Sequence, residues 1–185
     1  MIQIKNAAEL QKMRKACAIS AAALKAGGEA IEPGITTAEI DKIIYDFIVR
    51  HGARPNFLHL YGFPATACIS VNDTVIHGIP NKQQQIRPGD IVSIDTGCKI
   101  DGFNGDNACT YACGKIDLEA QRLLDVTKES LHRGIEMACG GNRVGDIGHA
   151  VQSYVEENGF SVVRTFVGHG VGKELHGDPE VPNFG

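Results

Sequence analysis

The sequence lacks the features of a membrane or secreted protein. Its uninterrupted apolar runs fall far short of the roughly 18 residues that a membrane span needs. The first residues, Met1-Ile2-Gln3-Ile4-Lys5, lack the apolar core of a signal peptide, so we expect a cytoplasmic protein without a membrane partner. Positive charge is not in excess either, because 18 Lys and Arg stand against 22 Asp and Glu, a formal net charge of −4. This balance argues against direct nucleic-acid binding.

Paired cysteine motifs are also missing. The six cysteines form no Cys-x-x-Cys pair, and no Cys/His spacing matches a structural zinc site. We therefore expect free, mostly buried thiols. What the chain does have is a globular composition, with 43% hydrophobic and 22% charged residues. Its length of 185 residues predicts one domain, residues 1–185.

Four helices are predicted from capping signals and apolar spacing. Their boundaries are marked by capping boxes at Asn6/Glu9 and Thr36/Glu39, by Asp117, and by Asn158-Gly159. Strands are predicted for residues 66–71, 91–100, 103–111 and 160–167. Because helices and hairpins alternate without βαβ regularity, we expect an α+β fold with an antiparallel sheet. Residues 178–185 are predicted to form a loop, which suggests that the sequence is a fragment.

The dipeptide Asp101-Gly102 between two β-rich runs is a strong hairpin signal. A two-residue loop places Asp95 opposite Ala108 and Gly97 opposite Asp106. Asp95 and Asp106 would then project from one face as diagonal neighbours, about 7–8 Å apart at the backbone. A buried pair of like charges is costly unless a cation neutralises it, and metal binding would supply that neutralisation. The alternative is that both carboxylates are solvated on an open sheet face.

Three histidines stand in glycine-rich loops: His77 before Gly78, His169 between Gly168 and Gly170, and His176 seven residues later. Together with the aspartate pair they indicate a hydrolytic metal site. The remaining histidines have no such setting and are interpreted as surface or packing residues; they are His51, His59, His132 and His149.

These motifs, taken in order, resemble one family. The segments are Cys68-Ile69-Ser70-Val71-Asn72 with His77-Gly78-Ile79-Pro80, Pro88-Gly89-Asp90-Ile91-Val92-Ser93-Ile94-Asp95, Asp101-Gly102-Phe103-Asn104-Gly105-Asp106, Ser161-Val162-Val163-Arg164, and Gly168-His169-Gly170-Val171-Gly172 with His176. The sequence is similar along its whole length to the bacterial form of the type I methionine aminopeptidases. The resemblance implies a pita-bread fold, a curved antiparallel sheet backed by helices.

The resemblance also implies an activity and a metal centre. The activity is removal of the N-terminal methionine when the second residue is small. Two divalent ions (Fe, Mn, Co or Zn) would be bound, with Asp95 on one metal, Asp106 bridging both and His169 on the other. His176 would contact the peptide and support the tetrahedral intermediate. His77 would lie near the scissile nitrogen and the leaving group.

The resemblance further implies a pocket for the methionine side chain formed by Cys68, Phe63, Leu60 and Leu175. Bacterial relatives often carry tyrosines where Leu60 and Phe63 stand, and often His in place of Asn104. The family's two remaining ligands are glutamates, one of them the general base, and their motifs lie beyond Gly185. Neither Glu174 nor Glu180 matches those motifs. We therefore expect an incomplete metal site and an inactive 185-residue form.

Two other functions remain open. One is a non-catalytic pita-bread module that binds peptides or partner proteins. The other is a proline-directed peptidase of the same fold, which normally brings a separate N-terminal domain. For the aminopeptidase, the expected partners are N-termini of nascent chains near the ribosome. We expect a monomer whose 185-residue form self-associates.

Overall fold

The computed structural model describes residues 2–185, and its contacts divide the chain into two compact units. The first, here called the sheet unit, comprises Ile4–Ile116 and Val171–Leu175. The second, called the helix-pair unit, comprises Asp117–Gly170 and His176–Gly185, together with the first residues of the chain. The expectation of one domain over residues 1–185 stays a prediction.

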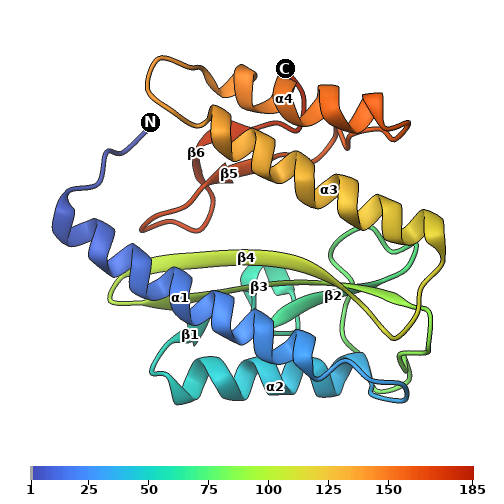
Figure 1. The fold of residues 1–185 in the computed structure, drawn as a ribbon. Helices are drawn as coiled ribbons and strands as arrows, with labels where there is room; N and C mark the ends of the chain where they lie inside the picture. The colour runs from blue at the N-terminus through green and yellow to red at the C-terminus, as the bar shows by residue number, and fades with distance from the viewer. Residues whose placement is uncertain (1) are drawn as a thin grey trace. The chain divides into compact units, whose positions relative to one another are not determined.

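The sheet unit holds two helices, a short 3-10 turn and four strands (Figure 1). They are α1 (Ala7–Glu29), α2 (Thr37–Arg50), β1 (Arg54–Pro55), η1 (Leu60–Gly62), β2 (Ala67–Val71), β3 (Ile91–Ile100) and β4 (Phe103–Ala112). The helix-pair unit holds α3 (Leu118–Met137), α4 (Val144–Glu157), β5 (Gly168–Gly170) and β6 (Gly177–Val181).

Both predicted capping boxes are confirmed at the starts of α1 and α2. The Asn6 side chain accepts a hydrogen bond from the Glu9 backbone N–H at 3.0 Å, and Glu9 accepts one from the Asn6 N–H at 3.1 Å. Helix α1 continues through Gly27 and Gly28 and ends at Glu29. A side-chain carbon on Gly27 would lie 2.7 Å from the Ile44 side chain, so the glycine allows α1 to pack closely on α2.

The four strands form one antiparallel sheet in which β3 pairs with β1 and β2 along one edge and with β4 along the other. The β3–β4 hairpin turns through Asp101-Gly102, with Ile100 opposite Phe103, as the sequence predicts. Both turn residues have positive φ, 52° for Asp101 and 82° for Gly102, which the tight turn requires.

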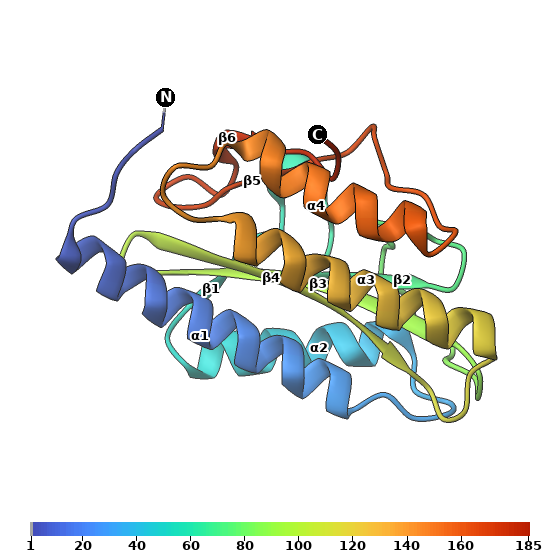
Figure 2. The ribbon, with the colours of Figure 1, turned by 45° about the horizontal axis from the view of Figure 1, so that its top comes forward.

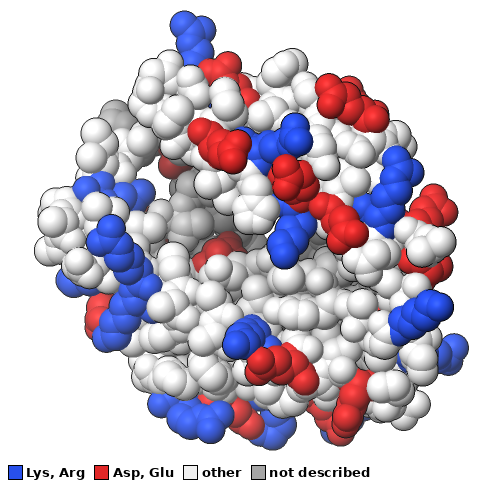
Figure 3. All heavy atoms as spheres, in the orientation of Figure 1, with Lys and Arg blue, Asp and Glu red and all other residues white. Residues whose placement is uncertain are grey.

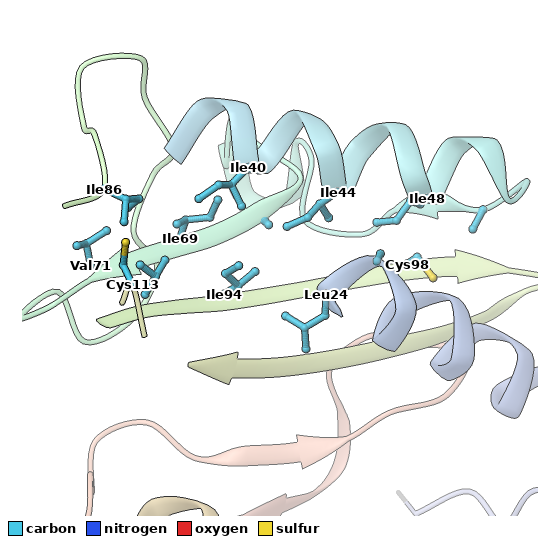
Figure 4. Packing of buried hydrophobic residues seen from close by; sticks show 14 residues of the cluster. Leu24, Ile40, Ile44, Ile48, Ile69, Val71, Ile86, Ile94, Cys98 and Cys113 are labelled. Atoms are coloured by element: carbon cyan, nitrogen blue, oxygen red, sulfur yellow. The ribbon is translucent and has the colours of Figure 1, made fainter. Parts of the chain in front are cut away.

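Helices α1 and α2 cover one face of this sheet (Figure 2). In Figure 4, Ile40, Ile44 and Ile48 form the buried stripe of α2 and face the sheet. From the strands, alternate residues such as Ile69 and Ile94 fill the same core. Because strand side chains alternate between faces, the residues between these, including Asp95, project from the opposite face.

In the helix-pair unit, α3 and α4 pack where Gly134 lies against Val151. The boundaries predicted from Asp117 and Asn158-Gly159 are confirmed. Two other predictions are wrong: residues 160–167 form no strand, and residues 178–185 are not only a loop. The strand instead spans Gly168–Gly170, because these are the residues that pair with β6; Gly168, for example, is opposite Val181. A β-rich composition without an adjacent partner does not make a strand.

All six cysteines are free, as expected, but only Cys68, Cys98 and Cys113 are buried. Within residues 2–185, no helix has both the length and the apolar character to cross a bilayer. On the face drawn in Figure 3, basic and acidic side chains are interspersed rather than gathered by sign.

Candidate metal centre

The two aspartates singled out by the hairpin register lie on adjacent strands. Asp95 of β3 is opposite Ala108, and Asp106 of β4 is opposite Gly97. The two carboxyl groups share a hydrogen bond, so they project from the same face of the sheet. This confirms the predicted juxtaposition, and it excludes the alternative of two separately solvated carboxylates.

The environment of Asp95 makes it energetically costly for Asp95 and Asp106 to be ionised at the same time. Burial raises the pKa of Asp95 to about 7, with the charge of Asp106 and the hydrogen bond between the two groups as further causes. A divalent cation would remove this cost by replacing the shared proton. The pair therefore fits a metal site, and carboxylate oxygens suit Mn, Fe, Co and Zn.

Beside Asp95 lies a buried thiol. Cys68 of β2 is its direct cross-strand neighbour, and its side chain is 5% exposed. Burial raises the pKa of Cys68 to about 12, and the charges of Asp95 and Asp106 act in the same direction. Cys68 therefore stays a neutral thiol, a small soft apolar surface next to the carboxylates.

Asp41 of α2 anchors the strand that carries Cys68. One of its carboxylate oxygens accepts hydrogen bonds from the backbone N–H groups of Thr66 and Ala67, at 2.9 and 2.8 Å. Burial raises the pKa of Asp41, and the two hydrogen bonds oppose that rise. Sequence reasoning missed this residue because a lone Asp inside an amphipathic helix has no distinguishing pattern.

The loop that carries His77 is also tied to β2. The backbone N–H of Gly78 donates to the Ser70 hydroxyl at 3.0 Å, and the Ile69 N–H donates to the Gly78 carbonyl at 2.8 Å. His77 itself has a φ of 58° and an exposed side chain. Its backbone is thus held in a left-handed conformation next to Gly78, which is hydrogen-bonded to Ile69 and Ser70 of the strand that carries Cys68.

In the helix-pair unit, the two other predicted histidines meet. The rings of His169 and His176 are 4.6 Å apart between centroids, in an edge-to-face arrangement. The Nδ1 atom of His169 lies 3.1 Å from the Gly170 carbonyl oxygen. When Nδ1–H donates to that carbonyl, Nε2 carries the free lone pair, which is the usual arrangement of a metal-binding histidine.

Among residues 2–185, no three His, Cys, Asp or Glu side chains are grouped closely enough to hold a metal ion. The sheet unit contributes Asp95 and Asp106, and His169 belongs to the helix-pair unit. The role of His169 as a ligand stays a prediction, as do the roles of His77 and His176.

Two of the predicted pocket residues, Leu60 and Leu175, line one cavity of about 310 Å³ in the sheet unit. Phe63 and Cys68 are not among the residues that line it. The cavity also contains Asn56, another residue that the sequence patterns did not indicate.

Comparison with known proteins identifies the family. The sequence pattern of metallopeptidase family M24 matches residues 11–185. The methionine aminopeptidase of Clostridium perfringens is 53% identical over 185 residues, which cover 100% of this chain and 74% of that protein. The chain belongs to metallopeptidase family M24, among the methionine aminopeptidases.

Solved structures agree with this family and with the pita-bread fold. The crystal structure of methionine aminopeptidase from Thermotoga maritima matches with a TM-score of 0.98 and 41% identity, covering 100% of this chain and 74% of that one. Prolidase from Pyrococcus furiosus matches with a TM-score of 0.85 over 98% of this chain and 52% of its own, at 23% identity. The likeness to the prolidase shows the fold alone. The resemblance to the methionine aminopeptidases is confirmed by sequence identity.

Proposed function

We propose that this chain removes the N-terminal methionine from nascent proteins and peptides whose second residue is small, using divalent metal ions bound by Asp95, Asp106 and His169. The observation that carries the proposal is the hydrogen-bonded carboxylate pair on β3 and β4, in a chain 53% identical to a methionine aminopeptidase. When bound there, divalent ions supply a Lewis acid for the scissile carbonyl and activate the attacking water.

The chain's own residues have separate tasks in this proposal. Asp95 and Asp106 hold the metal site as carboxylates, after losing the proton that they share without metal. His77 contacts the scissile nitrogen and the leaving group, and His176 stabilises charge on the tetrahedral intermediate. Cys68, with Phe63, Leu60 and Leu175, receives the methionine side chain, since an unbranched thioether packs well on soft apolar groups.

We also propose where this activity takes place and with which partners. The substrates are N-termini of nascent chains, met in the cytoplasm near the ribosome, without direct binding to nucleic acid or membrane. A polypeptide of residues 1–185 alone is expected to release no methionine, since no general base is identified in it, and to self-associate. Losing a base typically costs about 10²–10⁴ in rate.

The decisive experiment separates metal binding from turnover. Titration calorimetry with Mn²⁺ on the gene's full translation product should show that Asp106→Ala weakens binding at least about 100-fold. The matched control is Asp73→Ala, which removes an exposed turn aspartate and should leave binding unchanged. His169→Ala should also weaken binding, and unchanged affinity would remove His169 from the ligand set.

Methionine release from a Met-Ala-Ser peptide then tests the enzyme against the alternative of a peptide-binding module. Metal-dependent release by the wild-type product, lost in Asp106→Ala and kept in Asp73→Ala, supports the proposal. Peptide binding without any release, at saturating metal, would contradict it and favour the non-catalytic module. Full activity of a mass-verified 1–185 polypeptide would overturn its expected inactivity.

A further inference from the structure

The chain between His169 and His176 belongs to the sheet unit, although both histidines belong to the helix-pair unit. This segment, Val171–Leu175, is here called the connecting loop. It joins β5 to β6, since Gly170 and Gly177 pair on either side of it. The connecting loop starts two residues after His169 and ends immediately before His176. Whatever holds this loop therefore also restrains the backbone of both histidines.

Asn104 of β4 fastens the connecting loop to the sheet. Its backbone N–H and its side-chain Nδ2 both donate to the Gly172 carbonyl at 2.9 Å, and Nδ2 also donates to the Lys173 carbonyl at 2.9 Å. The two hydrogens of the amide are thus both used, one on each carbonyl. Asn104 is 2% exposed, so water has little access to replace these bonds. The asparagine amide is a fully used and buried anchor for the loop.

The other contacts of the connecting loop are closer to solvent. Lys99 of β3 donates to the Lys173 carbonyl at 2.9 Å. The Lys173 ammonium lies 2.9 Å from a Glu9 carboxylate oxygen and 5.7 Å from the centroid of the Phe103 ring. The Lys173 side chain is 59% exposed, and exposed ion pairs stabilise a fold only weakly. The buried amide of Asn104 is therefore the strongest of these attachments.

Asn104 also shares a strand face with the carboxylate pair. Side chains two residues apart on a strand point to the same face, so Asn104 projects from the face of Asp106. Lys99, which lies opposite Asn104, reaches the connecting loop from that same face. One short run of β4 thus carries both a proposed metal ligand and the anchor of the loop that joins the two histidines.

We propose that Asn104 is a positioning residue, which holds the connecting loop and thereby places His169 and His176 for their roles. The inference rests on the proposed function, in which His169 binds metal and His176 stabilises the tetrahedral intermediate. Asn104 acts through the loop and touches neither the metal nor the substrate. The rings of His169 and His176 are 4.6 Å apart between centroids, so release of the loop displaces both together.

The first test measures metal affinity, which needs no turnover. In titration calorimetry with Mn²⁺ on the gene's full translation product, Asn104→Leu should weaken binding about tenfold, the lower end of what the loss of a ligand's outer support costs. Leucine has the same branched skeleton as asparagine but no donor. Asn104→His keeps one ring N–H for a loop carbonyl and should recover most of the loss.

The matched control is Ser20→Ala. Ser20 of α1 is 0% exposed and donates to the Thr96 carbonyl at 3.0 Å, so its loss also removes a buried hydrogen bond from the sheet unit. Helix α1 covers the face opposite to that of Asp95, and this variant should keep Mn²⁺ affinity within about twofold of the wild type. Equal losses of affinity in Ser20→Ala and Asn104→Leu would overturn the inference, as would unchanged affinity in Asn104→Leu.

The second readout is spectroscopic and needs neither metal nor substrate. In the metal-free protein, the ring ¹H–¹³C signals of His169 and His176 should both move in Asn104→Leu and return towards their wild-type positions in Asn104→His. The signals of His51 and His149, on α2 and α4, are the internal references. Unmoved signals of His169 and His176 in a folded Asn104→Leu variant would overturn the inference.

A milder variant covers a failure of Asn104→Leu to fold. Lys99→Met keeps the buried amide and removes only the hydrogen bond from Lys99 to the Lys173 carbonyl. It should move the ring signals of His169 and His176 by a smaller amount and leave the reference signals in place. If neither ring signal moves in Lys99→Met, and Asn104→Leu does not fold, the proposal is rejected.

The two proposals fail separately. If the wild type releases no methionine from Met-Ala-Ser, but Asn104→Leu weakens Mn²⁺ binding and moves both histidine signals, only the proposed function fails. If the wild type releases methionine, and Asn104→Leu binds Mn²⁺ equally well and releases methionine equally fast, Asn104 is not a positioning residue and the proposed function stands.

Discussion

The two hairpins of this chain differ in how strongly local sequence specifies them. The β3–β4 hairpin joins two strands of ten residues through a two-residue turn, and its register is unbroken from Ile91 to Ala112. The β5–β6 hairpin pairs a strand of three residues with one of five, and its register shifts between His169 and Gly170. The long hairpin carries both aspartates, and the short one carries His169, opposite Glu180.

This difference shows when the register of two strands can be predicted by counting residues from the turn. A two-residue turn and alternating burial leave one register for β3 and β4, because a slip of one residue would turn the buried Ile94 outward. In β5–β6 the strands are short, glycine-rich and interrupted by an irregularity, so composition does not select a register. We therefore expect changes in the long hairpin to have larger effects than equivalent changes in the short one.

The largest expected effect is at Gly105 of β4. A side-chain carbon there would lie 2.5 Å from backbone atoms of Ala16 in α1. Because neither backbone can yield, Gly105→Val should lower the free energy of unfolding of the sheet unit by about 3 kcal/mol or more. Thermal or urea unfolding measures this. Gly140→Ala is the control, since nothing lies within 4 Å of its added carbon.

The equivalent change in the short hairpin sharpens the comparison. A side-chain carbon on Gly170 would lie 2.2 Å from the Asp178 carbonyl oxygen. Gly170→Val should raise amide hydrogen exchange in β5 and β6 while β3 and β4 stay protected. Global unfolding by Gly170→Val, matching that of Gly105→Val, would show that the two hairpins are equally important for stability.

A smaller loss is expected at Asp41, which anchors the strand beside β3. Asp41→Ala removes the acceptor of two backbone N–H groups and should cost about 2–3 kcal/mol. Asp41→Asn keeps an acceptor oxygen and removes a partly buried charge, so it should retain most of the stability. If the two variants unfold at the same urea concentration, the hydrogen bonds of Asp41 do not stabilise β2.

The carboxylate pair predicts a pH dependence of the metal-free chain. Burial and Asp106 raise the pKa of Asp95 to about 7 in the folded state, above its ordinary value. A carboxyl group whose pKa is higher in the folded than in the unfolded chain stabilises the folded state at pH values below its unfolded-state pKa. That stabilisation is lost as the pH rises through the folded-state pKa. From pH 5 to pH 8, stability should fall by on the order of 1–2 kcal/mol.

Two variants check the source of that fall. Asp95→Asn should remove most of it, and Asp106→Asn should lower the pKa of Asp95, read by carboxyl NMR. Added Mn²⁺ should reverse the fall in the wild type, because binding to the folded state stabilises it. A fall of the same size in Asp95→Asn would place the titrating group elsewhere.

The smallest effect is expected at the hairpin turn itself. Lys15 donates to the Asp101 carboxylate at 2.7 Å, but the two side chains are 53% and 46% exposed. Lys15→Ala should therefore cost less than about 0.5 kcal/mol, and salt should screen even that. A loss above 1 kcal/mol in a double-mutant cycle with Asp101→Ala would mean that the ion pair, rather than the Asp-Gly turn, holds the register.

Much of the sheet unit follows from local rules. The capping residues Asn6, Thr36 and Asp117 predict three helix starts, and each side chain does accept a hydrogen bond from the third residue of its helix. The errors lie at residues 160–167 and 178–185, where strand formation depends on which segment comes alongside. The composition of a segment does not by itself determine which other segment pairs with it.

The site divides in the same way. Sequence by itself determined the starts of α1, α2 and α3, the Asp101-Gly102 turn and hence the juxtaposition of Asp95 and Asp106, because each depends on neighbours within a few residues or on one short turn. Only the tertiary structure decided that Asp41 anchors β2, that Asn56 is buried beside Gly97 without a partner, and that His169 and His176 meet edge to face. These arrangements depend on burial and on contacts that no local spacing encodes.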